Sequence, residues 1–346
     1  MYMPVIKNRT VEMNVLKKLY QIPISPNIVP MIEMIQLKTK SNSNKDLTDE
    51  LEDIFCSNDE KRPFLIDIVK KNVPNNTTAV VRDFLTRVNR KPGYYEEIVN
   101  KFAKLENAIP VVSYNPNSYD PEDIENDVET LKDFNNLAFR VTSNTFKQAF
   151  LKVKELIKNG DYLVLDIGLA SHLNPALRRM YIDIQELKSK VNFTSIILNS
   201  TKSSEVTNVS LEDGEPIFTI DNSLRDTYSR LHQFDGFGDY ACIVNDLPSK
   251  GGGISPAGIY YSYQYNYFIG YRRNKDLAEF ENYIAPKIVS SEYWSEFSED
   301  HHQKCPGCQL IYSISRGEEP GKSQAKWKGI TMFHYIYTLS EKEGLQ

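Results

Sequence analysis

The feature that most constrains the fold is a recurrence of short apolar runs, each ending at a polar residue and followed by a helix-like stretch. The runs cover residues 2–6, 27–32, 63–66, 108–112, 137–139, 162–165, 193–198 and 236–238. They end at Lys7, Glu33, Asp67, Ser113, Arg140, Asp166, Asn199 and Asp239. Buried strands alternating with amphipathic helices are typical of a (β/α)8 barrel, in which residues at the C-terminal strand ends form one rim. We therefore predict an α/β fold with a TIM-like barrel.

The pattern changes after Asp239. Residues 259–263 and 267–271 are rich in tyrosine and predict a β-hairpin, residues 277–284 predict a helix, and the chain then reads as irregular through Gly321. An amphipathic run at 327–339 predicts the last barrel helix. The predicted organisation is a barrel at 1–240, an insertion at 241–326 and a final barrel helix at 327–346. Loops that follow barrel strands emerge on the C-terminal face, so we expect the insertion to cap that face.

Composition excludes several classes of protein. Hydrophobic residues make up 40% of the 346 residues and charged residues 25%, which suits a folded chain with a large core. A net charge of -5 argues against a protein that coats duplex nucleic acid. The start MYMPVIKNRT lacks the apolar core of a signal peptide, and no run reaches the roughly 20 apolar residues of a membrane helix. We expect a cytoplasmic protein with no membrane contact and with its 4 cysteines reduced.

The polar strand ends form the main candidate site. Carboxylates that converge on one rim can bind Mg²⁺ or Mn²⁺, and nearby cations can hold a phosphate and stabilise developing charge. We predict that Glu33, Asp67 and Asp166 bind the metal and act in catalysis with Lys7 and Arg140. Substrate-binding residues are predicted to be Asn199, Asp239 and Tyr240. The alternative interpretation is that these charged groups satisfy one another as buried ion pairs.

His172 lies in the segment DIGLASHLNP, on the loop expected to follow the sixth strand. An imidazole at that position can serve as a general base, and we include it among the candidate catalytic residues. A histidine at the entry to a helix, without a chemical role, explains the position equally well.

A second candidate site is the sequence HHxxCPGC, which contains His301, His302, Cys305 and Cys308. Two cysteines separated by two residues, with imidazoles beside them, offer the four ligands of a tetrahedral zinc site. A structural zinc site commonly uses a second, separated ligand pair, and Cys56 and Cys242 lie far away in the sequence. A redox pair is another alternative, and the pattern favours an ordinary Pro-Gly turn with reduced thiols over both.

The tyrosines between 260 and 271 form a third candidate site. Aromatic faces bind unpaired nucleobases, so this hairpin could hold nucleic acid or line a groove for a partner protein. The tyrosines alternate with polar residues, and that alternation is more often explained by a half-buried hairpin.

Several segments resemble a known family. They are YMPVIKNRTVEMNVLKKL at the start, PMIEMI, LVLDIG, GFGDY, and the stretch from His302 to His334 with Cys305-Pro306-Gly307 and KWKGITMFHYI. Together they resemble the beta-protein-like proteins, bacterial and prophage-borne proteins of mobile and phage-defence loci. The resemblance implies a barrel-like fold and a defence context, without a settled reaction. The chain departs from the family at Phe333-His334, where relatives carry paired histidines, so no family role is transferred to His334.

The predicted function is a metal-assisted hydrolase of antiphage defence, acting on a phosphate-containing or nucleic-acid substrate such as a nucleotide at the barrel mouth. The mixed rim of carboxylates and cations leads to this prediction. The alternative is a non-enzymatic sensor or scaffold that uses the barrel mouth and the aromatic hairpin to bind a phage or host protein. The sequence leaves the substrate and the oligomeric state open.

Overall fold

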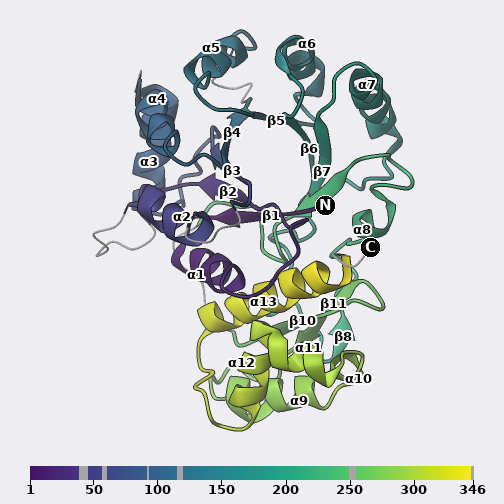
Figure 1. Ribbon diagram of the computed structural model, residues 1–346. Helices are drawn as coiled ribbons and strands as arrows, with labels where there is room; N and C mark the ends of the chain where they lie inside the picture. Colours follow the sequence, from purple (N-terminus) through teal and green to yellow (C-terminus); the bar gives the residue numbers. More distant parts are fainter. Residues whose placement is uncertain (39–45, 57–60, 92, 115–119, 249–254, 344–346) are drawn as a thin grey trace.

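A computed structural model of the chain describes residues 1–38, 46–56, 61–91, 93–114, 120–248 and 255–343. In these segments eight parallel strands close into a barrel in the order β1-β2-β3-β4-β5-β6-β7-β9, and helices surround it (Figure 1). The strands are β1 (Tyr2–Lys7), β2 (Met31–Met34), β3 (Phe64–Ile68), β4 (Ala108–Ser113), β5 (Ala138–Thr142), β6 (Tyr162–Gly168), β7 (Thr194–Asn199) and β9 (Gly236–Asp239). The predicted (β/α)8 barrel is confirmed.

Most of the surrounding helices form because they offer one apolar face to the strands. In α6, for example, the buried residues Phe146, Ala149, Phe150 and Val153 recur at helical spacing. The outer helices are α1 (Thr10–Leu19), α2 (Leu47–Phe55), α3 (Ala79–Arg90), α4 (Tyr94–Val99), α5 (Asp123–Thr130), α6 (Phe146–Leu156), α7 (Arg178–Lys188), α8 (Leu224–Thr227) and α13 (Gln324–Glu343). Short 3-10 turns follow α4 at Asn100–Phe102 and precede α7 at Pro175–Leu177.

The strand β9 is short and rich in glycine because it must approach β1 closely to close the barrel. A Cβ atom on Gly238 would lie 2.7 Å from the carbonyl oxygen of Met3, and one on Gly236 would lie 3.0 Å from that of Met1. Neither separation leaves room for a side chain. The two glycines weaken the strand pattern in the sequence, but they permit β9 to pair with β1 and β7.

The insertion contains the predicted hairpin and more regular structure than predicted. The strands β10 (Gly258–Ser262) and β11 (Tyr267–Tyr271) are antiparallel, and β8 (Glu215–Pro216) adds a third strand that the sequence did not predict. The predicted irregular stretch is wrong, because it holds helices of 4 to 10 residues. The helical elements are η3, a π-helix (Phe280–Ile284), α9 (Ala285–Val289), α10 (Glu292–Ser295), α11 (Glu299–Lys304) and α12 (Pro306–Ser315). Such short helices depend on tertiary packing and leave little periodicity to detect.

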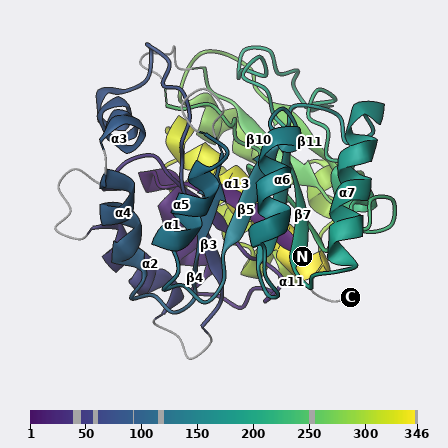
Figure 2. The ribbon, with the colours of Figure 1, turned by 90° about the horizontal axis from the view of Figure 1, so that it is seen from above.

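The hairpin and helices of the insertion do not lie over the C-terminal face of the barrel, where they were predicted. They lie beside the barrel, on the far side of α13 from the strands (Figures 1 and 2), and both β10 and α12 pack on α13 while its other side meets α1. Every residue from 329 to 340 is buried. A helix buried all round needs cover on both sides, and the insertion supplies the outer cover.

A short part of the insertion, residues 241–248, does cross the C-terminal face. Lys7 Nζ donates a hydrogen bond to the carbonyl of Val244 at 3.0 Å, and the amide of Thr78 donates to the carbonyl of Pro248 at 3.0 Å. The crossing begins with a sharp turn, since Ala241 and Cys242 have φ angles of 47° and 64°. Left-handed backbone at residues other than glycine costs about 1 kcal/mol or more, so surrounding contacts must hold this turn.

No helix among the described residues is both long enough and apolar enough to cross a lipid bilayer. The last three residues of the predicted final helix, 344–346, and residues 249–254 of the predicted insertion lie outside the described segments.

Asp239 joins the barrel to α13. Its Oδ1 accepts hydrogen bonds from the Tyr2 hydroxyl at 2.8 Å and the Ala241 amide at 2.7 Å, and its Oδ2 accepts one from the Tyr335 hydroxyl at 2.6 Å. All of these side chains are buried. Asp239 therefore faces α13, outside the barrel interior, and its contacts are those of a structural residue.

We expect Asp239→Ala to lower the free energy of unfolding by about 3 kcal/mol, because two buried tyrosine hydroxyls lose their acceptor. Asp239→Asn keeps one carbonyl acceptor and should lose about half as much. Urea denaturation of the three proteins measures both values. Equal stability of Asp239→Ala and the unaltered chain would contradict this assignment.

Candidate functional site

Arg140, in β5, extends its guanidinium across the barrel interior to carboxylates on three other strands. Its Nη1 donates hydrogen bonds to Glu33 Oε1 at 2.9 Å and Asp67 Oδ2 at 2.7 Å, and its Nη2 donates to Asp166 Oδ2 at 2.6 Å. Tyr240, which follows β9, accepts from Nη2 at 2.7 Å and donates to Glu33 Oε1 at 2.9 Å. We call these five residues the Arg140 cluster. The structure thus brings together four of the predicted catalytic residues.

Register explains why these side chains point into the same space. Lys7, Glu33 and Asp67 are directly paired positions on β1, β2 and β3, and Ser113 is paired with Arg140. Side chains at paired positions of parallel strands point to the same face of the sheet. Because the sheet is closed, that face is the barrel interior, and the long guanidinium can span it.

Lys7 contacts the cluster from the end of β1. Its Nζ lies 3.8 Å from Glu33 Oε2 and 4.7 Å from the centre of the Tyr240 ring. Burial lowers the pKa of the Lys7 ammonium to about 8, against the opposing effect of Glu33. Its hydrogen bond to Val244 links the cluster to the segment that crosses the barrel mouth.

The remaining oxygens of the cluster are mostly satisfied by neighbours at the rim. Ser113 Oγ donates a hydrogen bond to Asp67 Oδ1 at 2.7 Å, and the Gly168 amide donates to Asp166 Oδ1 at 2.9 Å. Glu33 Oε2 is buried and accepts no hydrogen bond from any described residue. Its stabilisation therefore depends on nearby positive charges, among them Lys71 and Lys7.

Opposite pKa shifts distinguish two of the carboxyls. Burial by itself raises the pKa of Glu33, but the positive charges of Lys71, Lys7 and Arg140 outweigh burial and hold that pKa well below its usual range. Burial raises the pKa of Asp67 more than Arg140 lowers it. Glu33 is thus a firmly ionised group, and Asp67 is the more easily protonated one.

The cluster is poorly suited to a divalent metal ion. The guanidinium of Arg140 already lies between the three carboxylates predicted as ligands, and its charge and that of Lys7 repel a second cation. Within the described segments, three or more potential ligand atoms converge elsewhere, at a group of histidines and cysteines. The arrangement observed here is the alternative weighed from the sequence, in which charged strand ends satisfy one another.

A cavity of about 760 Å³ opens beside the cluster, and Lys7, which contacts the cluster, also lines the cavity. Its walls come from the end of β1 and start of α1, Gln36 after β2, the loop after β7, the crossing segment 242–248, the start of β10 and the start of α13. The cavity therefore lies on the seam between the barrel mouth and the insertion. The sequence had not predicted this site, because its walls come from six separate segments.

The charge of the cavity wall is predominantly positive. Its described basic residues are Lys7, Arg9, Lys202 and Lys328, and its acidic residues are Glu12 and Asp246.

Contacts within the wall leave part of that positive charge unpaired. Lys328 Nζ lies 2.6 Å from Glu12 Oε1, whereas Arg9 and Lys202 form no ion pair with a described residue. Burial lowers the pKa of Lys328, the Glu12 carboxylate opposes this, and repulsion from Arg9 and Lys202 adds to the lowering. These cations are therefore close enough to repel one another. An anion bound between them would reduce this repulsion.

Two other predicted site residues lie apart from the cluster. His172 is buried, with Nδ1 2.8 Å from His232 Nε2 and Nε2 2.8 Å from Ser223 Oγ. Asn199 Nδ2 donates a long hydrogen bond, 3.4 Å, to the carbonyl of Asp221. Neither contacts the Arg140 cluster. His172 is thus packed in a polar pair with His232, which fits the interpretation without a chemical role.

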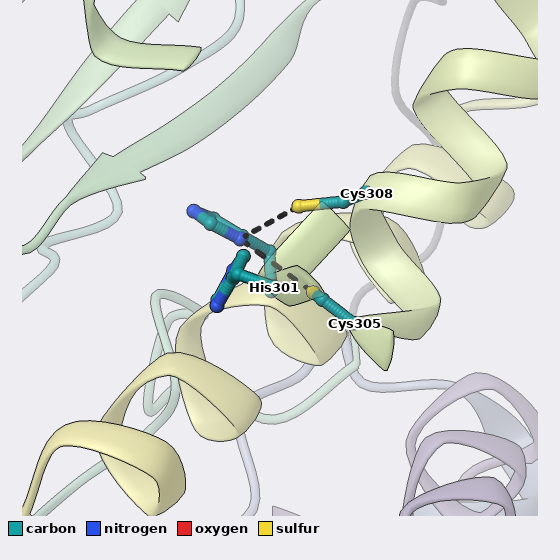
Figure 3. A group of neighbouring side chains, drawn as sticks. His301, Cys305 and Cys308 are labelled. Carbon is teal, nitrogen blue, oxygen red and sulfur yellow. Dashed lines mark hydrogen bonds between the residues drawn. The ribbon is translucent and has the colours of Figure 1, made fainter. Parts of the chain in front are cut away.

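A second group contains His301, Cys305, Cys308 and His334, whose ligand atoms all lie within 4.8 Å of one another. Figure 3 shows His301, Cys305 and Cys308 pointing toward a common centre. The prediction that included His302 is wrong, because the His302 ring stacks on Trp294 with centroids 4.0 Å apart and takes no part in the group. Helical geometry could have indicated this, since residues four apart share a face and His301 precedes Cys305 by four.

The chain matches the sequence model of the Beta protein family over residues 2–340, nearly its whole length. It belongs to this family. No curated protein matches the chain. The family description names no reaction, so the chemistry of this member must be inferred from its own residues.

We expect Arg140→Ala to lower the free energy of unfolding by about 3 to 5 kcal/mol, because three buried carboxylates lose their counterion. Urea denaturation measures the loss. Arg87→Ala is the matched control, since Arg87 and Asp83 form an exposed ion pair on α3 and contribute about 0.5 kcal/mol. A loss no larger than that of the control would show that the cluster is not held by Arg140.

Proposed function

We propose that this member of the Beta protein family binds a phosphate-containing ligand of nucleotide size in the cavity at its barrel mouth. The observation that carries the proposal is the set of four basic side chains on the cavity wall, against two acidic ones among the described lining residues. Two of the basic residues, Arg9 and Lys202, have no carboxylate partner in the described part of the chain. Their positive charge favours the binding of an anion in the cavity.

The start of α1 provides further support for an anion. The helix begins at Thr10, and its N-cap residue Arg9 forms no side-chain cap hydrogen bond, because a guanidinium cannot accept one. Val11 and Glu12 line the cavity at the first turn, where backbone amides lack intrahelical acceptors. Helix N-termini with such amides bind phosphate through both hydrogen bonds and the helix dipole.

The size and composition of the cavity favour an organic phosphate over the inorganic ion. Small-molecule sites commonly measure about 300 to 1,000 Å³, and the 760 Å³ here falls in that range. Apolar groups also line the cavity, among them Ile243, Leu247, Ile259 and Trp327. A base or sugar could contact these while its phosphates meet the cations.

The same geometry favours binding over metal-assisted hydrolysis at the carboxylates. One oxygen of each carboxylate predicted to bind Mg²⁺ or Mn²⁺, in Glu33, Asp67 and Asp166, already accepts a hydrogen bond from Arg140. A role in antiphage defence stays a prediction that rests on the family resemblance. Ligand binding at the mouth is compatible with it, whether or not the ligand is later cleaved.

Calorimetric titration with ADP, pyrophosphate and adenosine tests the proposal. We expect ADP and pyrophosphate to bind, adenosine to bind much more weakly, and the affinity of ADP to fall as salt is raised. Arg9→Ala and Lys202→Ala should each raise Kd for ADP about tenfold, the effect of losing one charge-assisted contact.

Lys190→Ala is the matched control, because Lys190 is exposed beyond the end of α7 and does not line the cavity. It should leave Kd unchanged. Absence of binding by both ADP and pyrophosphate, or equal effects of Lys190→Ala and Lys202→Ala, would refute the proposal. Adding Mg²⁺ to the same titrations separates a metal-dependent site from one that uses the cations alone.

A second candidate function, binding of a phage or host protein, is favoured by an exposed aromatic patch beside the hairpin. Phe218 is 82% exposed and Tyr265 is 51% exposed. The ring of Tyr267 connects them, with centroids 6.2 Å from Phe218 and 5.4 Å from Tyr265. Tyr260, Tyr261 and Tyr271, which the sequence offered as contact residues, are buried and serve the core.

Affinity capture from phage-infected and uninfected cells tests this second candidate. We expect the double substitution Phe218→Ser and Tyr265→Ser to abolish capture of an infection-dependent partner, because the exposed apolar contact area is lost. Leu151→Ser on α6, where Leu151 is 55% exposed, is the matched control and should retain it. A partner recovered equally by both variants would exclude this patch as the binding surface.

A further inference from the structure

The group of His301, Cys305, Cys308 and His334 gathers side chains from three helices. His301 comes from α11, Cys305 from the junction of α11 and α12, Cys308 from the first turn of α12 and His334 from the middle of α13. All four are buried, with exposed fractions of 1% or less. The group therefore lies where the insertion packs on the last barrel helix.

The distances within the group resemble the edges of a zinc tetrahedron. His334 Nδ1 lies 3.4 Å from Cys308 Sγ and 3.7 Å from Cys305 Sγ. Bond lengths of about 2.3 Å for zinc to sulfur and 2.0 Å for zinc to nitrogen give a tetrahedral S to N edge of about 3.5 Å. The other pairs lie within 4.8 Å, so shifts of about 1 Å complete the tetrahedron.

His334 is oriented as a metal ligand. Its Nε2 lies 2.9 Å from the carbonyl oxygen of Tyr261, and because a carbonyl can only accept, Nε2 carries the proton. In the neutral imidazole the Nδ1 lone pair then faces both sulfurs. A backbone carbonyl that holds the distal N–H of a histidine is a usual second contact of metal ligands. The Tyr260 ring stacks on the imidazole at 4.0 Å and holds it in this orientation.

His301 is also oriented as a metal ligand, with one ring nitrogen hydrogen-bonded and the other without a partner in the described part of the chain. Its Nδ1 lies 2.8 Å from Glu341 Oε2, which can only accept when ionised. Its Nε2 is buried and has no hydrogen-bond partner among the described residues. A buried, unpartnered imidazole nitrogen is costly, and a metal ion would remove that cost. Glu341 would then accept a hydrogen bond from a metal-bound imidazole, an arrangement that is common in zinc sites.

The CPGC segment is shaped to bring its cysteines against α13. Pro306 starts α12, and a Cβ on Gly307 would lie 2.7 Å from the backbone nitrogen of His334. No side chain larger than hydrogen fits in this gap. The close approach of the two backbones places both thiols next to the imidazole of His334.

We propose that His301, Cys305, Cys308 and His334 bind one zinc ion, which joins the insertion to the last helix of the barrel. Two sulfur and two nitrogen ligands suit zinc in tetrahedral geometry. The protein supplies all four ligands and encloses them, so no position is open for water or substrate and the ion is structural. This site is separate from the cavity at the barrel mouth and does not depend on the ligand proposed there.

Elemental analysis of the purified full chain, reduced and supplied with zinc, tests the proposal. We expect about one zinc ion per chain, and less than about a tenth of that in Cys308→Ser and in His334→Ala. His302→Ala is the matched control, because His302 is adjacent in sequence but outside the group, and it should keep the full content. Removal of zinc by a chelator should lower Tm.

Cobalt keeps the test independent of whether the variants fold. Co²⁺ added to the unaltered chain after zinc removal should give the intense visible bands of tetrahedral coordination by two thiolates and two imidazoles. A folded, reduced chain that binds neither zinc nor cobalt would overturn the proposal. So would equal zinc loss in His302→Ala and Cys308→Ser, or a Cys305–Cys308 disulfide that, once reduced in the presence of zinc, takes up no metal.

Discussion

The buried guanidinium of Arg140 is the interaction on which the barrel mouth depends. It is the shared counterion for Glu33, Asp67 and Asp166, and through Tyr240 it also holds the end of β9. Three carboxylates in a dry interior would repel one another without it. The same guanidinium lies between the three carboxylates that were predicted to bind a divalent metal. A rim that resembles a metal site in the sequence is thus a charge-balanced core in the fold, and the ligand-accessible positive charge lies beside it.

The helix α13 links the remaining features. It is buried on all sides from residue 329 to 340, since it packs on α1 toward the barrel and on β10 and α12 toward the insertion. Its start lines the cavity through Trp327 and Lys328, its middle carries His334, and Tyr335 donates a hydrogen bond to Asp239. The proposed ligand site and the proposed zinc site therefore share one helix. Loosening the contact between insertion and α13 would disturb the cavity wall as well.

Local sequence patterns were sufficient to predict the strands and to place part of the candidate site. Each apolar run ends within three residues of the end of a barrel strand, so Glu33, Asp67, Arg140 and Asp166 could be assigned to one rim before their contacts were known. Chemical roles could not be assigned in the same way. A carboxylate next to a metal and one next to a guanidinium look alike in sequence, and the choice depends on where one long side chain reaches across the barrel.

The sequence by itself determined the barrel, its strand order and the polar character of its mouth, because strand and helix periodicities are set by neighbours along the chain. Tertiary structure alone decided which groups meet. Arg140 and Glu33 are 107 residues apart, Lys328 and Glu12 are 316 apart, and the fourth member of the histidine and cysteine group is His334 and not the adjacent His302. Such contacts depend on how whole segments pack, which no local pattern contains.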